Sequence, residues 1–600
     1  MLTIPNYNFS NILTNADALL IVPPFAELKW PSLALHILQA CAKKAGFSVK
    51  VFYANLAMAA WIQEDNYQYI CEKRFLGETI FSRNAYSEKF IDIFSRIEPG
   101  SFKDCLIEIE NHIDAWIKCL IDEILKHQYK VIGCTTSFEQ TNSSIALINQ
   151  VKRSHPEIIT ILGGANCQEV LAEGILSLSN NIDYVFSGES EIVFPEFLKD
   201  ILNGTTPKNR IIHEQLCDLD DIPVPDYSDY ICQLDYFSSN WKFKKRKYYL
   251  SYETSRGCWW GRKNRCNFCG TFGVTKYREK SPEKVIQDLS YLIKSFGIKQ
   301  IFMTDCIMPY NYYKTLLPKV ASLFQDIQIF YELKSNTTFE QLVLLKKAGV
   351  KRVQPGIESL SSSLLKRMNK GVFARQNISL LRNAKSLGIS CYWNFLYSFP
   401  DDTEDDYKEI CSLLPLMVHL EPPLHYSALV LTRFSPYFNY PNKFGIKNIT
   451  PQSKYKCCFP SNSIEKVASE FDGEYESFSK QNQSLMSEIR QKIEKWQELW
   501  KSKQLPKLEL VVNSKGKYLL IDTRGLGEPL VQTITPKQAM VILFDRPVDS
   551  SQKGLDEEIN WGLNHKLLIT IDSWYISLVT AAPELINEIK SLPFLVDYAI

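Results

Sequence analysis

The stretch SRGCWWGRKNRCNFCG, residues 255–270, decides the fold, because its three cysteines follow the first strand of a repeating pattern. Cys258, Cys266 and Cys269 have the spacing C-x7-C-x2-C, and YYLSYETSRG (248–257) is predicted to be a strand that ends in a turn. Further candidate strands, separated by helical stretches, recur at 299–306, 327–336, 351–359, 390–400 and 425–436. These six strand-helix repeats predict a partial (β/α)6 TIM barrel. Chemistry in such barrels lies at the carboxyl ends of the strands, where the cysteines fall.

Three closely spaced thiols can hold metal in two ways. A structural zinc site needs four ligands, and no histidine lies between His213 and His419, so the fourth would be a distant residue such as Cys232 or Cys306. The intervening CWWGRKNRC is aromatic and basic, unlike a tight zinc loop. An iron–sulfur cluster is held by cysteine thiolates, and three of them on a four-iron cluster leave one iron open to a small molecule. The pattern favours the cluster and leaves zinc as the alternative.

The first 205 residues read as alternating strands and helices. Apolar runs predict five buried strands at 18–25, 47–54, 130–138, 159–167 and 182–190, with a mostly helical insertion over about 58–128. This predicts an open parallel sheet of the Rossmann-like (flavodoxin-like) type, whose ligands bind beyond the carboxyl ends of the strands. Those ends read PPF, TTSF, GGAN and SGES, which let a large flat ligand approach the backbone and equally suit tight turns. No GxGxxG fingerprint of a dinucleotide site occurs.

The remaining segments differ in kind. A stretch rich in Asp, Pro and Tyr predicts a linker, which ends in the basic run WKFKKRK (241–247). A charged, predicted helical segment carries an apolar stripe of Leu485, Ile489, Ile493, Trp496 and Trp500. The last block predicts an α+β winged-helix-like domain, with a hairpin over 506–524, a Thr-Pro helix start and a wing around Asp572-Ser573. The predicted domains are 1–205, the linker 206–247, 248–460, the helical segment 461–505, and 506–600.

Composition bounds the class of protein. The chain has 600 residues, 45% of them apolar and 22% charged, as in a soluble globular protein of several domains. Its net charge of +1 favours neither nucleic acid nor an anionic membrane as a partner. Residues 1–15 lack the features of a signal peptide, and no apolar run is long enough for a membrane span. Sixteen cysteines without an even framework fit a reducing cytosol, so we expect a cytoplasmic protein.

Three cysteines after the first strand of a partial barrel resemble the radical S-adenosylmethionine (SAM) superfamily. The commoner spacing there is C-x3-C-x2-C, and the longer spacing is similar to that of cobalamin-binding radical SAM proteins that mature ribosomally synthesised peptides (RiPPs), many of them C-methyltransferases. Blocks such as VQPGIESLSSSLLKRMNKG, YWNFLYSFPDDTEDDY and RFSPYFNYPNKFGI resemble that family. Further upstream, VPPF, TTSFEQTNSS, LGGANC and IDYVFSGESE resemble its cobalamin-binding domain. The resemblance covers about residues 15–460.

The resemblance implies cofactors and the residues that hold them. Cys258, Cys266 and Cys269 would bind a [4Fe–4S] cluster. Contacts to SAM would come from Phe268, Thr304, Asp305, Glu332, Lys334, Glu358, Ser359 and Asn394. Contacts to cobalamin would come from Pro23, Pro24, Thr135, Thr136, Ser137, Phe138, Gly163, Gly164, Ala165, Gly188 and Glu189. The Gly-Gly-Glu expected after the second barrel strand is replaced by TDCIMP, and D-x-H-x-x-G is absent, so we expect cobalt without a histidine ligand and His36 on a helix.

The implied function is a RiPP maturase that C-methylates an unactivated carbon. Its partners would be a precursor peptide and an electron donor such as flavodoxin or ferredoxin, with no nucleic acid and no membrane. The winged-helix-like block would recognise the peptide, because residues 550–580 carry too few basic side chains for nucleic acid. One alternative is a radical SAM enzyme that epimerises, rearranges or crosslinks a peptide without cobalamin. Another is a non-catalytic peptide-binding protein, against which the three cysteines argue.

Overall fold

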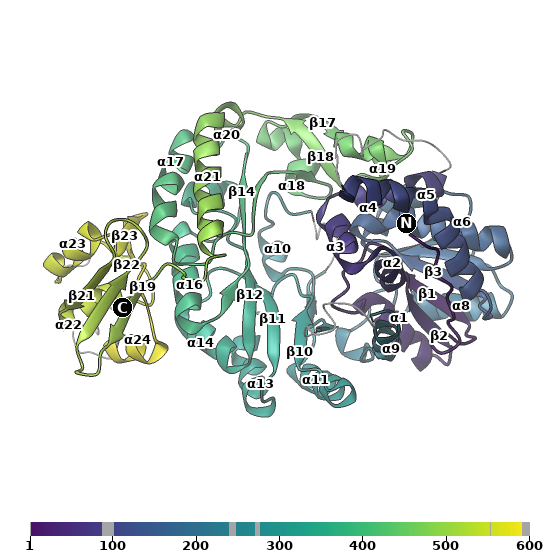
Figure 1. The fold of residues 1–600 in the computed structure, drawn as a ribbon, viewed down its shortest axis with the longest axis horizontal. Coiled ribbons are helices and arrows are strands. Elements are labelled where there is room, and N and C mark those ends of the chain that lie inside the picture. Colours follow the sequence, from purple (N-terminus) through teal and green to yellow (C-terminus); the bar gives the residue numbers. More distant parts are fainter. Residues whose placement is uncertain (1, 87–100, 239–247, 271–275, 552–553, 591–600) are drawn as a thin grey trace. The chain divides into compact units, whose positions relative to one another are not determined.

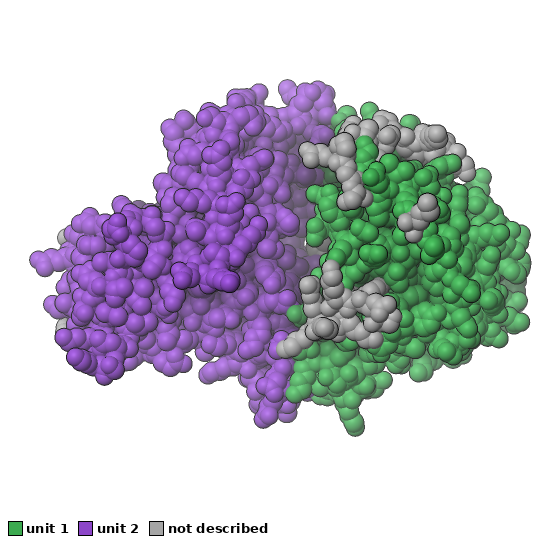
Figure 2. Space-filling view, in the orientation of Figure 1, with its two compact units in different colours: residues 1–252, 287–300, 450–471 green, residues 253–286, 301–449, 472–600 purple. Residues whose placement is uncertain are grey.

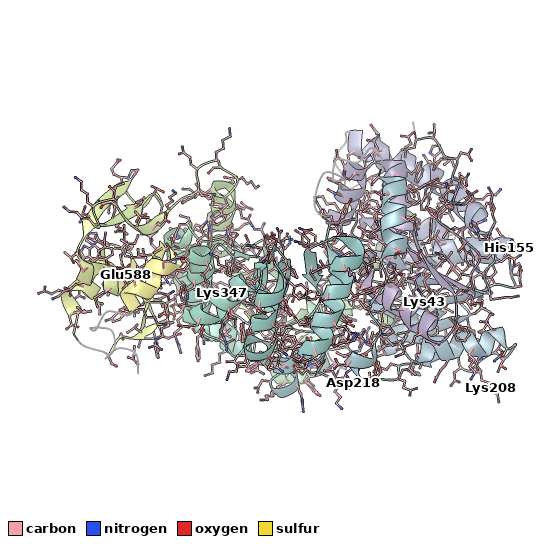
Figure 3. The ribbon with its side chains drawn as sticks, turned by 90° about the horizontal axis from the view of Figure 1, so that it is seen from below. Lys43, His155, Lys208, Asp218, Lys347 and Glu588 are labelled. Carbon is pink, nitrogen blue, oxygen red and sulfur yellow. The ribbon has the colours of Figure 1, made fainter. Side chains whose placement is uncertain are left out.

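The structure is a computed structural model that describes residues 2–86, 101–238, 248–270, 276–551 and 554–590. It forms two compact units (Figure 2). Unit 1 comprises residues 1–252, 287–300 and 450–471, and unit 2 comprises residues 253–286, 301–449 and 472–600. Within the described ranges, no helix is both long and apolar enough to cross a membrane. Exposed charges of both signs lie on unit 1, such as Lys43 and Asp218, and on unit 2, such as Lys347 and Glu588 (Figure 3).

A parallel sheet forms the centre of unit 1, in the order β2-β1-β3-β4-β5-β6 (Figure 1). The five predicted strands appear as β1 (Ala18–Val22), β2 (Val49–Tyr53), β3 (Val131–Thr135), β4 (Ile159–Gly163) and β5 (Tyr184–Ser187). Every residue of β1 is buried, as expected for a strand covered on both faces. The parallel Rossmann-like sheet predicted from the apolar runs is therefore present, with one strand more than expected.

Helices cover this sheet. The crossover helices are α1 (Leu33–Lys44), α6 (Thr141–Ser154), α7 (Val170–Ser177) and α8 (Val193–Leu202). The predicted helical insertion appears as α2 (Ala54–Ile62), α3 (Glu64–Glu72), α4 (Leu76–Tyr86) and α5 (Ser101–Ile124). His36 lies on α1 as expected, fully buried, with its ring nitrogens bonded to Gln39 and the Tyr53 hydroxyl.

The predicted linker is more ordered than its composition indicated. It contributes β6 (Ile211–His213) to the edge of the sheet and forms α9 (Ser228–Phe237). Gln233 of α9 accepts a hydrogen bond from the Tyr53 amide at 2.8 Å and donates to the Val51 carbonyl at 2.7 Å. The sequence shows no clear period here, and α9 forms because it satisfies backbone groups of the edge strand β2. The basic run 241–247 lies outside the described residues.

Unit 2 contains the repeats of the predicted barrel. Its strands β10 (Gln300–Met303), β11 (Gln328–Leu333), β12 (Val350–Pro355) and β13 (Ser390–Cys391) are neighbours in one sheet, and β14 (Asn394–Tyr397) pairs in parallel with β15 (His425–Ala428). A bridge between Glu358 and Phe395 continues from β12 to β14. Crossover helices of this unit include α14 (Phe339–Lys347) and α16 (Ala374–Leu387). The runs 390–400 and 425–436, each predicted as one strand, are each broken in two, the second of them into β15 and β16 (Leu431–Thr432).

The segment predicted as wholly helical, 461–505, is only partly so. It contains α19 (Ile464–Val467), the strand β18 (Glu470–Glu474), α20 (Phe478–Gln481) and α21 (Gln483–Leu499). The apolar stripe of α21 is a packing face: Ile489, Ile493 and Trp496 are buried. The Trp496 indole donates to the Leu420 carbonyl at 2.8 Å. The helical prediction failed at β18 because strand pairing overrode the local charge pattern.

The C-terminal block forms the predicted hairpin, helix start and wing. Its strands β19 (Leu508–Val512), β20 (Tyr518–Asp522) and β21 (Leu530–Ile534) form a sheet with β25 (Thr580–Ala581). In the described residues of this block, the hairpin is followed by α22 (Pro536–Ile542), α23 (Asp556–Asn564) and α24 (Pro583–Lys590). The wing strands β23 (Leu568–Ile571) and β24 (Trp574–Ser577) meet at Asp572 and Ser573, both with positive φ. The winged-helix name itself stays a prediction.

Candidate functional site

The three cysteines of the opening motif lie on a short loop that starts at a left-handed turn. Gly257 has a φ of 75°, a conformation that side chains disfavour. Cys258 then caps α10 (Trp259–Lys263), and its sulfur accepts a hydrogen bond from the Gly261 amide at 3.4 Å. Cys266 and Cys269 follow α10 within a turn, in which the Cys269 amide donates to the Cys266 carbonyl at 3.2 Å. All three thiols are partly buried and line one cavity of about 310 Å³.

Carboxyl ends of barrel strands supply the polar wall of this cavity. Five of the predicted SAM contacts line it: Phe268, Glu332, Lys334, Glu358 and Asn394. Three others do not: Thr304, Asp305 and Ser359. Cys306, Gln354, Lys370 and Trp393 also line the cavity, although the sequence did not single them out as SAM contacts. The barrel thus brings the cysteine loop and the strand ends together as the fold prediction required, and the individual contacts to SAM stay predictions.

The charged groups of the cavity are strongly coupled. Lys370 Nζ lies 2.9 Å from Glu358 Oε1, and the lysine side chain is only 14% exposed. Burial favours the neutral amine, but Glu358 and Cys266 outweigh it and raise the pKa of Lys370 above its ordinary value. Burial, with the charges of Asp305 and Glu358, raises the pKa of Glu332 to about 7. Burial lowers the pKa of Lys334 to about 8.

The residues of this cavity fit an anionic iron–sulfur cluster and an amino-acid-bearing cofactor. Three thiolates need a compensating cation, and Lys370 and Lys334 supply ammonium groups at the same cavity. Among the described residues, the buried Oδ1 of Asn394 accepts no hydrogen bond, so it offers an acceptor to a ligand. In the same part of the chain, no group of three or more His, Cys, Asp or Glu is arranged to hold a single metal ion. A four-iron cluster takes its thiolates from a wider space than one zinc ion does.

The predicted cobalamin contacts fall into two groups. Pro23, Pro24 and Thr136 are buried, and the Thr136 hydroxyl donates to the Gly163 carbonyl at 3.1 Å. Gly164, Ala165 and Gly188, at the ends of β4 and β5, are exposed. A side chain at Gly164 would meet the Thr136 carbonyl oxygen at 2.5 Å, so this backbone must stay bare. The β4–β5 end therefore fits the approach of a flat ligand, and the buried proline pair does not.

The remaining predicted positions at these strand ends are intermediate. Thr135, Ser137, Gly163 and Glu189 are half-buried. Ser137 and Gln140 bond each other in a capping box at the start of the helical segment before α6. The side chain of Phe138 lies outside the described part of the structure. These residues cap a helix or form turns. The alternative that the strand ends only make tight turns therefore explains them at least as well as contacts to a ligand do.

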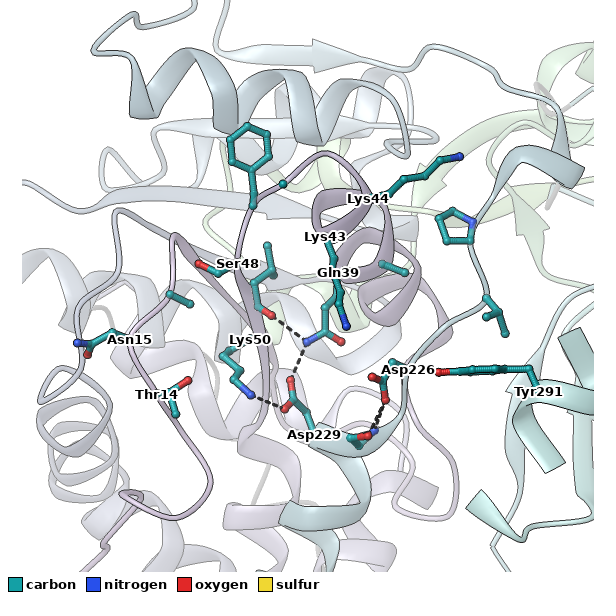
Figure 4. A pocket seen from close by; sticks show the side chains of 18 residues that line it. Thr14, Asn15, Gln39, Lys43, Lys44, Ser48, Lys50, Asp226, Asp229 and Tyr291 are labelled. Atoms are coloured by element: carbon teal, nitrogen blue, oxygen red, sulfur yellow. Dashed lines mark hydrogen bonds and ion pairs between the residues drawn. The ribbon is translucent and has the colours of Figure 1, made fainter. Parts of the chain in front are cut away.

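A second cavity, of about 730 Å³, lies in unit 1 at the amino ends of β1 and β2 (Figure 4). Two of its charges pair with each other: Lys50 lies 3.0 Å from Asp229, whose carboxylate also accepts from Gln39 at 2.7 Å. Ligands of open parallel sheets bind at the opposite, carboxyl edge. We therefore assign this cavity no part in the chemistry.

Comparison with known proteins identifies the barrel. Residues 252–414 match the Radical SAM superfamily. The chain is 26% identical over 305 residues to an uncharacterized methyltransferase of Pyrococcus horikoshii, a match that covers 48% of this chain and 64% of that protein. Residues 252–414 are thus a radical SAM domain, and the chain is similar in sequence to a methyltransferase. A domain of this class implies a [4Fe–4S] cluster and SAM as cofactors.

Solved structures extend the likeness beyond the barrel. The cobalamin-dependent radical SAM enzyme OxsB, with aqua-cobalamin and SAM bound, aligns with a TM-score of 0.55 at 14% identity, over 81% of this chain and 66% of that chain. The radical SAM methyltransferase TsrM from Kitasatospora setae, with cobalamin and a [4Fe–4S] cluster bound, aligns with a TM-score of 0.52 at 14% identity, over 80% and 91%. At this identity the likeness shows a shared fold. The chain spans just under two thirds of the Pyrococcus relative and of OxsB.

Proposed function

We propose that this chain is a cobalamin-dependent radical SAM methyltransferase that methylates an unactivated carbon of a ribosomally made precursor peptide. The radical SAM chemistry is supported above all by one observation: three thiols and the polar strand ends line the same cavity. The cobalamin part is supported by the fold likeness to OxsB and TsrM and by the bare backbone at Gly164 and Gly188. The peptide part is supported by the C-terminal block, which offers an exposed edge strand.

Each group of residues has its own task in this proposal. When bound, the cluster supplies the electron that cleaves SAM and cobalamin supplies the methyl group. Cys258, Cys266 and Cys269 hold the cluster from one side of the cavity, leaving the strand-end wall for SAM. Phe268 offers an apolar face to a base, and Asn394 offers a carbonyl oxygen to an ammonium group. Leu333 and Trp393 line the same cavity and exclude water from it.

A second candidate is a radical SAM enzyme that epimerises or crosslinks a peptide without cobalamin. The burial of Pro23, Pro24 and Thr136 favours it, because these residues cannot contact a ligand without rearranging. The two candidates share the cluster and the substrate class. They differ in whether the chain retains cobalamin and in the mass of the product.

The test starts with the full chain, produced with hydroxocobalamin and reconstituted anaerobically with iron and sulfide. We expect about four irons per chain and cleavage of SAM by the wild type. Cys258→Ala should lose both, whereas Cys232→Ala, which changes a cysteine outside the cavity, should keep both. Stoichiometric zinc with retained activity would contradict the cluster. Mass spectrometry of the co-expressed peptide then decides between the candidates: methylation adds one methylene per site, epimerisation leaves the mass unchanged, and a crosslink removes two hydrogens.

A further inference from the structure

A short segment, which starts at the last residue of α15 (Ser362–Arg367) and leads to α16, is hydrogen-bonded to the cysteine loop. We call residues 258–269 the cluster loop and residues 367–371 the clamp segment. Four bonds join them: Asn267 N to Met368 O (2.9 Å), Asn267 Nδ2 to Arg367 O (2.6 Å), Asn369 Nδ2 to Arg265 O (2.9 Å) and Trp260 Nε1 to Asn369 O (3.2 Å). Two of these bonds, both made by Asn369, involve the stretch between Cys258 and Cys266. The clamp segment therefore holds the long x7 spacer of the motif.

Trp260 packs this spacer against the clamp segment. A side chain at Gly371, where φ is 65°, would meet the Trp260 ring at 2.1 Å, so only glycine allows the contact. On the same tryptophan, Lys334 Nζ lies 3.1 Å from the ring centroid, a cation–π contact. Lys334 also donates to the Lys370 carbonyl at 2.9 Å. Lys334, at the end of β11, thus contacts both the cluster loop and the clamp segment, and it does so next to residue 370.

This fastening places the Lys370 ammonium at the cavity that the three thiols line. Its position is fixed by the 2.9 Å pair with Glu358 and by the Phe268 ring, whose centre lies 5.4 Å away. A partly desolvated cation interacts with nearby charge far more strongly than an exposed one does. A cluster held by three thiolates is anionic and gains one more negative charge when it is reduced. A fixed positive charge beside it therefore favours the reduced form.

We propose that Lys370 is a positioning residue that raises the reduction potential of the bound cluster, and that the clamp segment fixes it there. In this proposal Lys370 does not ligate iron, and the carboxylate of Glu358 partly offsets its positive charge. The inference rests on the proposed cluster and goes beyond it, because it assigns the control of electron acceptance to a residue outside the cysteine motif. The electron itself comes from an external reductant, dithionite in the test.

The test is a redox titration of the reconstituted full chain by electron paramagnetic resonance, without SAM. We expect Lys370→Met to make reduction about tenfold less favourable, a shift of about 59 mV to lower potential for one electron. Lys370→Arg keeps the charge and should stay near the wild type. Glu358→Gln leaves Lys370 unpaired and should shift the potential upward. Lys366→Met, the same change at an exposed lysine one turn earlier in the chain, is the matched control and should not move it.

We expect Lys370→Met to lower the reduction potential and Glu358→Gln to raise it. Either variant can therefore still test the inference if the other fails to load a cluster. Potentials of both variants within the range of Lys366→Met, or shifts in the same direction, would overturn the inference while leaving the proposed function intact. A wild type without a cluster would overturn both. As a second measurement, Asn369→Gly removes the bond to Arg265 but keeps the positive φ of 54° accessible. We expect this variant to lose iron to a chelator about fivefold faster, and an unchanged rate would contradict the clamp.

Discussion

Asp305, one of the predicted SAM contacts, makes hydrogen bonds that the sequence did not indicate. Its place after β10 predicted a contact to SAM, but the structure turns its carboxylate to the segment before the cluster loop. It accepts hydrogen bonds from the amides of Thr254 (2.7 Å) and Ser255 (2.6 Å) and from the Thr254 hydroxyl (2.6 Å). The side chain is 1% exposed. In this arrangement Asp305 fixes the backbone that leads into the cysteine motif, and it does not line the cavity.

Replacement of Asp305 should therefore cost stability. Asp305→Ala leaves the two buried amides of Thr254 and Ser255 without an acceptor, and we expect the free energy of unfolding to fall by about 3 kcal/mol. Chemical denaturation of the anaerobic protein measures this. Asp405→Ala removes an exposed carboxylate and should change the free energy by less than about 0.5 kcal/mol. Full stability of Asp305→Ala with a specific rise in the Kd for SAM would restore the original interpretation.

The same carboxyl group predicts a pH dependence. Burial outweighs the hydrogen bonds and raises the pKa of Asp305 from 3.8 to about 7. The folded state then holds the proton more tightly than the unfolded state does, so this contribution to stability is fully present below pH 3.8 and is lost as the pH rises through about 7. We expect the difference in unfolding free energy between wild type and Asp305→Asn to shrink across that window. A constant difference would show that the carboxylate is charged throughout.

At the scale of elements, α4 and α6 cap each other. Glu78, in the first turn of α4, accepts from the amides of Thr141 (2.9 Å) and Asn142 (2.7 Å) at the start of α6. Glu139, just before α6, accepts from the amides of Phe75 and Gly77 at the start of α4. Each helix thus satisfies amide donors at the amino end of the other, where negative charge is also favoured. No local pattern announces this, because the paired residues lie about sixty positions apart.

Removal of one of these caps should destabilise unit 1. Glu78 is 3% exposed, and burial raises its pKa to about 8. Glu78→Ala leaves two buried amides without an acceptor, so we expect a loss of about 3 kcal/mol in unfolding free energy. Glu72→Ala, at an exposed glutamate at the end of α3, is the control and should be near neutral. Equal stabilities would mean that water replaces the carboxylate.

At the scale of the whole chain, the C-terminal block is fastened to the outside of the barrel. Arg382 of α16 is 1% exposed and donates to the Val579 carbonyl at 2.6 Å, and Asn383 donates to the Asp545 carbonyl at 2.8 Å. Deleting residues 506–600 would uncover this buried guanidinium. Loss of peptide modification on deletion would thus not separate binding from stability, and a point change on the free edge of the block is the sharper test.

β21 is the edge strand of the block's larger sheet, and Val531 on it is 63% exposed. If a peptide adds to this edge, Val531→Lys should lose the burial of one valine, about 1.5 kcal/mol, or about tenfold in peptide affinity. Fluorescence anisotropy with a labelled precursor peptide measures it, with SAM cleavage unchanged. Val512→Lys, at an exposed valine on the inner strand β19, is the control. Equal effects of both changes would argue against the edge.

The sequence by itself determined the features that depend on local pattern. Cysteine spacing located the cluster loop, and runs of apolar residues located the strands of both sheets, because burial imposes a periodicity that neighbours in the chain reveal. Turn residues such as Asp572 and Ser573 located the wing for the same reason, since their backbone conformation is a local property.

Only the tertiary structure decided which polar groups meet. Lys370 lines the cavity, where it contacts Glu358 and Lys334. Asp305 instead bonds to Thr254 and does not line the cavity. Likewise, α9 lies in a segment whose composition indicated a linker, yet it folds because Gln233 satisfies the backbone of β2. In each case, the partner lies far away in the sequence, and the free energy of a buried charge or amide depends on that partner more than on its neighbours in the chain.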